Sequence, residues 1–431
     1  MQTTFTLAQL ADPNIAEADK ILRACVHCGF CTATCPTYVL LGDELDSPRG
    51  RIYLIKDMLE QGRAASEVEA KHLDRCLSCL NCMTTCPSGV HYMHLVDHAR
   101  DHVEETYRRP LADRLMRLIL ATIVPRPNLF RLALAGAALA KLIGGQYWLP
   151  KRLAAMVALA KLPATPRRSD EPGVTLALGA KRGRVAMLAG CAQPVLRPEI
   201  NAAAIRLLSR LGIEVVVAEG AACCGSLTHH MGLEEQAMRS AKANIAAWHR
   251  EIVRSGLDAI LMTTSGCGTT IKDYGYLFRN DPVWRDRARM VSERALDITE
   301  YLAKLDLPAA GRARGLRVAY HSACSLQHGQ KVTEPPRQLL SAAGFEVLSV
   351  PEGHLCCGSA GTYNMLQPDL SRALRDRKAA NIDGLKPALV ATGNIGCMEQ
   401  LAPAIGVPIL HTVELLDWAH GGPKPAALTR I

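Results

Sequence analysis

Short apolar runs alternate with longer helix-like stretches from about residue 184 to the end of the chain. Each run has the length and composition of a buried strand. They are RVAMLAG (184–190), IEVVVAEG (213–220), LDAILMTTSG (257–266), LRVAYHSA (316–323), FEVLSVPEG (345–353) and PALVATGN (387–394). Strand–helix alternation predicts parallel sheets with crossover helices, so we expect an α/β arrangement in this part.

The sequence pattern of the N-terminal part is typical of helices instead, for example over RGRIYLIKDMLEQG (49–62). A chain of 431 residues is too long for one hydrophobic core. The pattern therefore predicts an α+β multidomain protein. Its expected parts are a helical domain (1–107), a basic helical segment with a linker rich in Pro, Arg and Gly (108–183), and two α/β domains (184–311 and 312–431).

Positive charge is concentrated in residues 108–168, which hold twelve Lys or Arg and one acid, Asp113. That stretch carries +11, whereas the whole chain carries +9. Its apolar runs are shorter than the roughly 20 residues a transmembrane helix needs. Amphipathic basic helices suit an anionic membrane surface or a docking partner. The alternatives are a helical linker packed on the protein, and nucleic-acid binding, which the lack of interleaved aromatic residues disfavours.

Two cysteine runs near the N-terminus share the spacing C-x2-C-x2-C-x3-C-P, with the second run 51 residues after the first. This spacing is typical of bacterial ferredoxins, in which three cysteines of one run and the fourth of the other hold each [4Fe–4S] cluster. We therefore assign one cluster to Cys25, Cys28, Cys31 and Cys86, and the other to Cys76, Cys79, Cys82 and Cys35.

Zinc is the main alternative for these runs, because paired C-x2-C motifs also bind zinc. A structural zinc site seldom uses a third cysteine at i+6 followed by Cys-Pro. A disulfide framework is disfavoured too, since residues 1–20 lack the basic, apolar pattern of a secretory leader. We expect a reducing compartment.

The remaining eight cysteines form an internal repeat. They are Cys191, Cys223, Cys224 and Cys267, then Cys324, Cys356, Cys357 and Cys397. The separation between counterparts is the same for the first three pairs and only slightly shorter for the fourth, which indicates a duplication. Each set follows predicted strands, so its thiols are expected to converge at the carboxyl edge of a sheet. Gly225 and Gly358 would allow the tight backbone after each double cysteine.

The duplicated C…CCG…C pattern resembles the cysteine-rich (CCG) domain found in heterodisulfide reductase and in anaerobic glycerol-3-phosphate dehydrogenase. With the ferredoxin pair, nearly the whole chain resembles the glycolate oxidase (glycolate dehydrogenase) iron–sulfur subunit family. This resemblance implies partner subunits that bind FAD and dehydrogenate glycolate, often D-lactate as well. It implies electron delivery to quinone or the respiratory chain, by a peripheral protein on the cytoplasmic face of the bacterial inner membrane.

One departure from the CCG pattern concerns its fifth cysteine, which is replaced by Thr270 in the first repeat and Gln400 in the second. Each repeat thus offers four thiolates as a candidate second type of redox or metal site. Reduced structural thiols and a redox disulfide are the alternatives. Five histidines lie near these cysteines in the sequence, and each is a candidate for a further ligand or, as the alternative, a hydrogen-bonding or surface residue. They are His229, His230, His321, His328 and His354.

No catalytic residue is expected on this chain, because it lacks a dinucleotide fingerprint, a P-loop and a G-x-S-x-G motif. Oxidation of a hydroxy acid requires a flavin or nicotinamide, which a partner chain would hold. We therefore expect an electron-transfer subunit. The alternatives are a CCG-type reductase for another 2-hydroxy acid, glycerol-3-phosphate or a disulfide, and a zinc-stabilised binding module.

Overall fold

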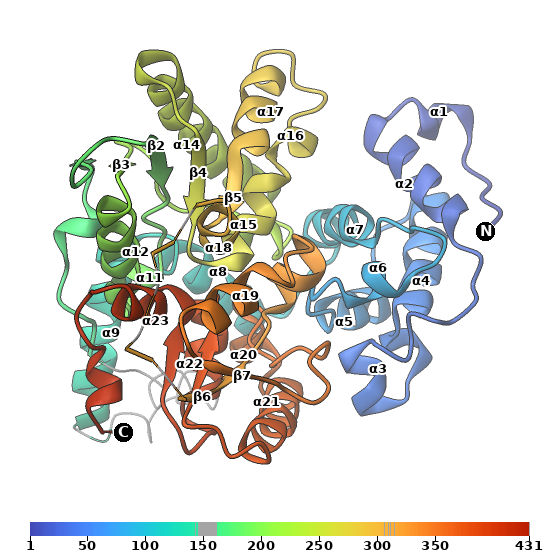
Figure 1. The fold of residues 1–431 in the computed structure, drawn as a ribbon. Coiled ribbons are helices and arrows are strands. Elements are labelled where there is room, and N and C mark those ends of the chain that lie inside the picture. Colours follow the sequence, from blue (N-terminus) through green and yellow to red (C-terminus); the bar gives the residue numbers. More distant parts are fainter. Residues whose placement is uncertain are drawn as a thin grey trace.

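The computed structural model describes residues 1–142, 144, 162–305, 307–308, 310, 312–313 and 315–430. The N-terminal part is helical, as predicted, and surrounds its own apolar core (Figure 1). Its elements are α1 (Leu7–Leu10), α2 (Pro13–Ala24), α3 (Pro36–Leu41), η1 (Glu44–Asp46), α4 (Pro48–Glu60), α5 (Glu67–Asp74), α6 (Asn81–Thr85) and α7 (Tyr92–Thr106). Helix α4 confirms the helix predicted over 49–62, but it ends two residues earlier, at Glu60.

The first α/β unit contains a five-stranded sheet of order β1-β3-β2-β4-β5, parallel except for β1 at its edge. The strands are β1 (Gly173–Thr175), β2 (Gly183–Met187), β3 (Ile213–Val217), β4 (Ala259–Met262) and β5 (Ala295–Asp297). The helices are α11 (Gln193–Leu196), α12 (Glu199–Arg210), α13 (Ser226–His229), α14 (Glu234–Ser255), α15 (Ser265–Lys272), α16 (Tyr274–Leu277), α17 (Arg285–Arg294) and α18 (Ile298–Leu302), with the short turn η3 (Arg168–Asp170) before β1.

The second unit repeats this arrangement with a fully parallel sheet of order β7-β6-β8-β9. Its strands are β6 (Arg317–Tyr320), β7 (Glu346–Ser349), β8 (Leu389–Thr392) and β9 (Ile409–His411). The other elements are the π-helical turn η4 (Ser325–Gly329), α19 (Pro335–Ala342), α20 (Tyr363–Leu366), α21 (Pro368–Asp383), α22 (Ile395–Leu401), α23 (Thr412–Ala419) and η5 (Ala426–Arg430).

Strand register confirms that the two sheets are copies. Val185 pairs with Ala259 in the first sheet, and Val318 pairs with Leu389 in the second, at the offsets of the cysteine repeat. The two units do not have separate hydrophobic cores, because one apolar cluster includes buried residues of both sheets. Helices α12 and α23 pack together across the junction.

Three strands were not predicted. Strand β1 lies within the expected linker, and the three-residue strands β5 and β9 are too short to give an alternation signal. Strand β5 pairs with β4, and β9 pairs with β8. Their extended conformation therefore depends on pairing with a strand that is distant in sequence.

The basic segment forms α8 (Leu111–Ile123) and α9 (Pro127–Leu142), while residues 143 and 145–161, including three of its cations, lie outside the described residues. Helix α8 buries Met116 and Leu120 against Met231. The guanidinium groups of Arg109 and Arg117 face the acidic side chains of the helical part. Helix α8 therefore fits the packed-linker interpretation. Within the described residues, no helix combines the length and apolarity that a membrane span requires.

Candidate metal centres

The two ferredoxin-type loops have matching backbones. His27 and Gly29 in the first loop have positive φ angles of 55° and 83°, and Ser78 and Leu80, the equivalent residues of the second loop, have 48° and 61°. Left-handed backbone is unfavourable for residues other than glycine, at about 1–3 kcal/mol each. Its occurrence at equivalent positions of both loops indicates that each loop is shaped to aim its cysteines at one centre.

Cysteines 25, 28, 31 and 86 line a single cavity, together with Cys82. Burial, and then the neighbouring thiols of Cys25, Cys35 and Cys86, raise the pKa of Cys31 to about 11. The Cys31 thiol therefore resists ionisation unless a cation compensates it. The cavity brings together the four ligands assigned to the first cluster. Its rim is open, because Cys28 is exposed and the side chains of Val26 and Phe30 are 66% and 63% exposed.

The other four ferredoxin cysteines lie deeper. The Cys82 thiol interacts with those of Cys79, Cys76 and Cys35, and burial raises its pKa well above the usual value. Two donors of the helical part approach these sulfurs: Arg51 Nη1 lies 3.8 Å from Cys35 Sγ, and Tyr92 Oη lies 3.8 Å from Cys76 Sγ. Arg51 is 1% exposed. Its guanidinium also bonds to buried Asp46 at 3.3 Å and to the His72 carbonyl oxygen at 2.7 Å, so it is a buried, paired cation beside this centre.

In the first repeat, four thiols from three strand ends converge. Cys191 follows β2, Cys223 and Cys224 follow β3, and Cys267 lies in the first turn of α15 after β4. Interactions with the Cys191 and Cys224 thiols lower the pKa of Cys223 to about 3, while Cys223 and Cys267 raise that of Cys224. The opposite directions of these shifts reflect sulfur atoms that face one another in a buried group.

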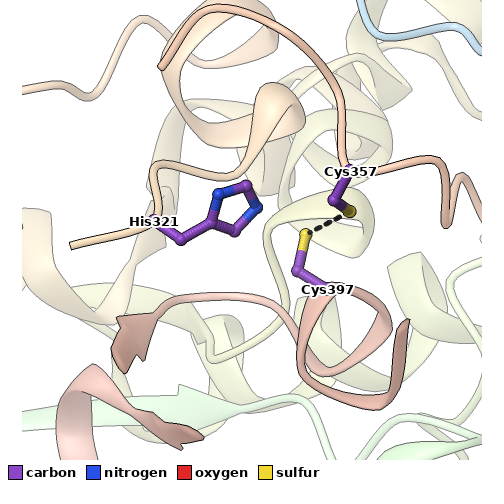
Figure 2. A group of neighbouring side chains, drawn as sticks. All are labelled: His321, Cys357 and Cys397. Atoms are coloured by element: carbon purple, nitrogen blue, oxygen red, sulfur yellow. Dashed lines mark hydrogen bonds between the residues drawn. The ribbon is translucent and has the colours of Figure 1, made fainter. Parts of the chain in front are cut away.

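The second repeat places its four thiols in the same way. Cys324 contacts Cys356, Cys356 contacts Cys357, and the Cys357 and Cys397 Sγ atoms are 3.5 Å apart (Figure 2). Gly225 and Gly358 both have φ of 86°, as their predicted role requires. A Cβ atom at Gly358 would lie 2.4 Å from the Ser371 carbonyl oxygen, and one at Gly225 would lie 2.8 Å from that of Ala237.

The structure describes all five candidate histidines, and among them His321 lies beside thiols. Its ring offers one nitrogen within 4.8 Å of Cys357 Sγ and Cys397 Sγ. Burial lowers the pKa of His321 to about 3, so the ring is neutral. His229 and His230 face Asp97 at 3.4 and 3.3 Å, and both ring nitrogens of His328 lie within hydrogen-bond distance of Thr84 or the His354 carbonyl oxygen.

The second repeat lies directly on the loop of the second ferredoxin motif. Asn81 Nδ2 donates to the His354 carbonyl oxygen at 3.0 Å, and Thr84 Oγ1 lies 2.8 Å from His328 Nδ1. Below these contacts, Cys79, Cys324 and Cys356 belong to one apolar cluster. Sequence reasoning did not identify this junction, because its two sides come from opposite ends of the chain.

The donor sets fit iron–sulfur chemistry. Soft thiolates suit iron–sulfur clusters and zinc. All sixteen cysteines are free of disulfide bonds, and in three groups their sulfurs face other sulfurs. Such buried sets of like-charged ligands need a bound cation for full ionisation.

Comparison with protein families matches the cysteines to two domain types. The family described as "4Fe-4S dicluster domain" matches residues 21–90, and the family described as "Cysteine-rich domain" matches residues 185–272 and 318–402. The matches together cover more than half of the chain. The second family is matched twice, as the duplication predicts.

Relatives match over most or part of the chain. The glycolate oxidase iron-sulfur subunit of Escherichia coli (strain K12) is 46% identical over 420 residues, 97% of this chain and 99% of that protein. The probable glycolate oxidase iron-sulfur subunit of Bacillus subtilis (strain 168) is 33% identical, over 93% of this chain and 94% of that one. Lactate utilization protein A of Geobacillus thermodenitrificans is 25% identical over 54% of this chain and 98% of its own length.

Among solved structures, a hypothetical protein from Helicobacter pylori superposes with a TM-score of 0.56 at 8% sequence identity, over 97% of this chain and 74% of that one. At this identity the likeness concerns the fold alone.

Proposed function

Because the chain belongs to the family of glycolate oxidase iron–sulfur subunits, we propose that it carries electrons from an FAD-binding partner that oxidises glycolate, and D-lactate as a second substrate, to the quinone pool. It is an iron–sulfur electron-transfer subunit of an oxidoreductase. The observation that carries the proposal is the pair of ferredoxin-type loops, which have left-handed backbone at equivalent positions and bring cysteine sulfurs together in two groups.

The residues proposed to hold the two [4Fe–4S] clusters are Cys25, Cys28, Cys31 and Cys86, and Cys76, Cys79, Cys82 and Cys35. Such a cluster, when bound, accepts and releases one electron at a time. The protein tunes that exchange through burial and hydrogen bonds to sulfur. Arg51 and Tyr92 supply donors near the second set, where they favour the more negative, reduced state.

Two features of this arrangement support a direction for the proposed relay. The open rim at Cys28, Val26 and Phe30 is the proposed contact of the flavoprotein partner, because exposed apolar side chains there lie beside the first ligand set. The second set lies under the second repeat and carries the donors that hold an added electron. Electrons would enter at the rim and move inward.

We propose helix α9 as the contact with the membrane. Its leucines 129, 132, 139 and 142 are exposed, and so is Arg126 just before the helix, whereas Arg131 donates to the Pro194 carbonyl oxygen at 2.8 Å. Exposed leucines beside a cation suit the boundary of an anionic lipid surface. The proposed location is therefore the cytoplasmic face of the inner membrane.

The relay is tested by Cys79→Ala in the complex with the partner subunits. We expect about four fewer iron atoms per chain. Quinone reduction should be lost, while glycolate still reduces the FAD of the partner. Met83→Leu, a volume-conserving change in the same loop, is the control. Wild-type quinone reduction by the Cys79 variant would refute this path.

Membrane binding is tested by flotation of the complex with vesicles containing anionic lipid. The double variant Leu132→Glu, Leu139→Glu removes two leucines that would each contribute about 1–2 kcal/mol when buried. We expect at least about a tenfold weaker binding. Val283→Glu, at an exposed position of the first repeat, is the control. Equal binding of both variants would exclude α9 as the membrane contact.

A further inference from the structure

His321 is a buried side chain whose ring nitrogens have no hydrogen-bond partner among the residues that the structure describes. The residue is 1% exposed, and both Nδ1 and Nε2 are unpaired. Leaving a buried polar group unsatisfied costs about 1–3 kcal/mol. The ring lies beside Cys357 and Cys397, whose sulfur atoms are metal ligands when ionised (Figure 2). A metal ion between them would take one ring nitrogen and the two sulfur atoms as ligands, while the other ring nitrogen keeps its proton.

The first repeat has no histidine at this position. The separation that relates β2 to β6, and Cys191 to Cys324, places Leu188 at the position of His321. Leu188 is buried and has no ligand atom. The duplicated scaffold therefore holds four potential ligands in one repeat and five in the other.

A second difference concerns charge. Gly225 packs on the backbone of Ala237, and its counterpart Gly358 packs on the backbone of Ser371. Asn244 and Lys378 each lie seven residues after these contacts, so they are counterparts in the two repeats. Asn244 makes neutral hydrogen bonds to the backbone of the double-cysteine loop.

Lys378, by contrast, is 2% exposed and donates to the Glu352 carbonyl oxygen at 2.6 Å. The thiols of Cys324, Cys356 and Cys357 act electrostatically on this ammonium group. The second site thus has a buried cation that can balance part of the charge of its thiolates.

We propose that the second repeat holds an iron centre with mixed ligands, in which the imidazole of His321 joins Cys324, Cys356, Cys357 and Cys397, and that the first repeat cannot form the same centre. The imidazole would supply the fifth ligand from another part of the repeat, because the sequence position of the fifth cysteine holds Gln400. Imidazole and thiolate together suit iron and zinc.

The position of the site favours iron over zinc. Cys324 and Cys356 share an apolar cluster with Cys79, a ligand proposed for the second ferredoxin centre. The transfer would move one electron from that centre, which is oxidised, to the second-repeat iron, which is reduced, without any bond formed or broken. Only the direction of this transfer rests on the proposed function. Ligation by His321 does not.

The test uses the full chain, isolated without oxygen and poised at a series of potentials. Pulsed EPR should detect hyperfine coupling to a histidine nitrogen, which should change when the protein is labelled with [15N]histidine. His321→Leu, which copies the residue of the first repeat, should remove the coupling. It should also weaken iron retention by the second repeat about 10- to 100-fold during dialysis against a chelator. His354→Leu, two residues from Cys356, is the control and should retain both.

His321→Cys separates ligation from folding, since it restores a ligand without nitrogen: iron should stay and the nitrogen coupling should vanish. Absence of nitrogen coupling in the wild-type chain, or its persistence in His321→Leu, would overturn the proposal. Stoichiometric zinc at this site would overturn the assignment of iron. If the nitrogen coupling is present but the complex does not reduce quinone, the proposed function fails and this inference stands.

Discussion

The two repeats share the same backbone arrangement and differ in the side chains that lie beside their cysteines. Both have a parallel core of the same strand order, the same left-handed glycine after the double cysteine, and an equivalent ion pair between the first two strands of that core, Arg184–Glu214 at 2.8 Å and Arg317–Glu346 at 3.5 Å. They differ at one strand end, where Leu188 packs in an apolar cluster with Cys224 and His321 lies beside Cys357 and Cys397.

The difference teaches how a duplicated fold acquires two roles. Backbone features that hold four thiols at a sheet edge are common to both copies. The ligand set and the nearby charge depend on single side chains at strand ends, where a change does not disturb the sheet. Packing adds a third difference, because Cys324 and Cys356 lie beside Cys79 and their counterparts have no such contact in the described apolar cluster.

The comparison would be broken most directly by removing one thiol from each repeat. Cys356→Ala should lower quinone reduction by the complex at least about 100-fold, because it removes a ligand beside Cys79. Cys223→Ala, its counterpart, should lower the rate less than about threefold. Steady-state turnover measures both, with iron content and thermal unfolding as checks on folding. Equal losses would mean that both repeats lie on the electron path.

A smaller effect is expected from the buried charge. Lys378→Met should lower the reduction potential of the second-repeat centre by about 60 mV, a tenfold change in a one-electron equilibrium. The loss of a positive charge beside thiolates destabilises the reduced form, which is the more negative one. A spectroscopic redox titration measures the shift, and Asn244→Leu should leave this potential unchanged. An unchanged potential in Lys378→Met would show that the ammonium group does not balance the site.

The smallest expected effect concerns the equivalent N-caps of α18 and α23. Burial raises the pKa of Asp297 to about 6, and burial lowers that of His411 to about 4. Between pH 4 and 6 the folded chain holds an extra proton at Asp297, so this group stabilises less as pH rises. At His411 the folded chain binds fewer protons between pH 4 and 6.5, so this group stabilises less as pH falls.

Asp297→Asn keeps a capping oxygen and removes the buried charge. It should raise the free energy of unfolding by about 1–3 kcal/mol at pH 8 and by little at pH 4. Chemical denaturation at the two pH values measures this difference. A gain of equal size at both would exclude the carboxylate charge as its cause. His411→Asn should flatten the decline in stability below pH 6.5.

Much of the fold was predictable because its signals are local. Apolar runs predicted six of the strands. The spacing of the cysteines predicted the two ferredoxin-type loops and the duplication of the α/β unit. The separation shared by three cysteine pairs also matches Leu188 with His321, a signal that sequence inspection could have used. Strands β5 and β9 were missed because three residues carry no periodicity. The burial of Arg51 and the packing of α8 depend on partners that are distant in sequence.

The amino-acid sequence alone determined the number, spacing and duplication of the cysteines, since covalent spacing sets which sulfurs a short loop can bring together. It also determined the helical and α/β parts, because periodicity is a property of neighbouring residues. Only the tertiary structure decided which repeat lies against Cys79 and which of five histidines faces thiols. These two facts arise from packing between segments far apart in the chain, which no local pattern encodes.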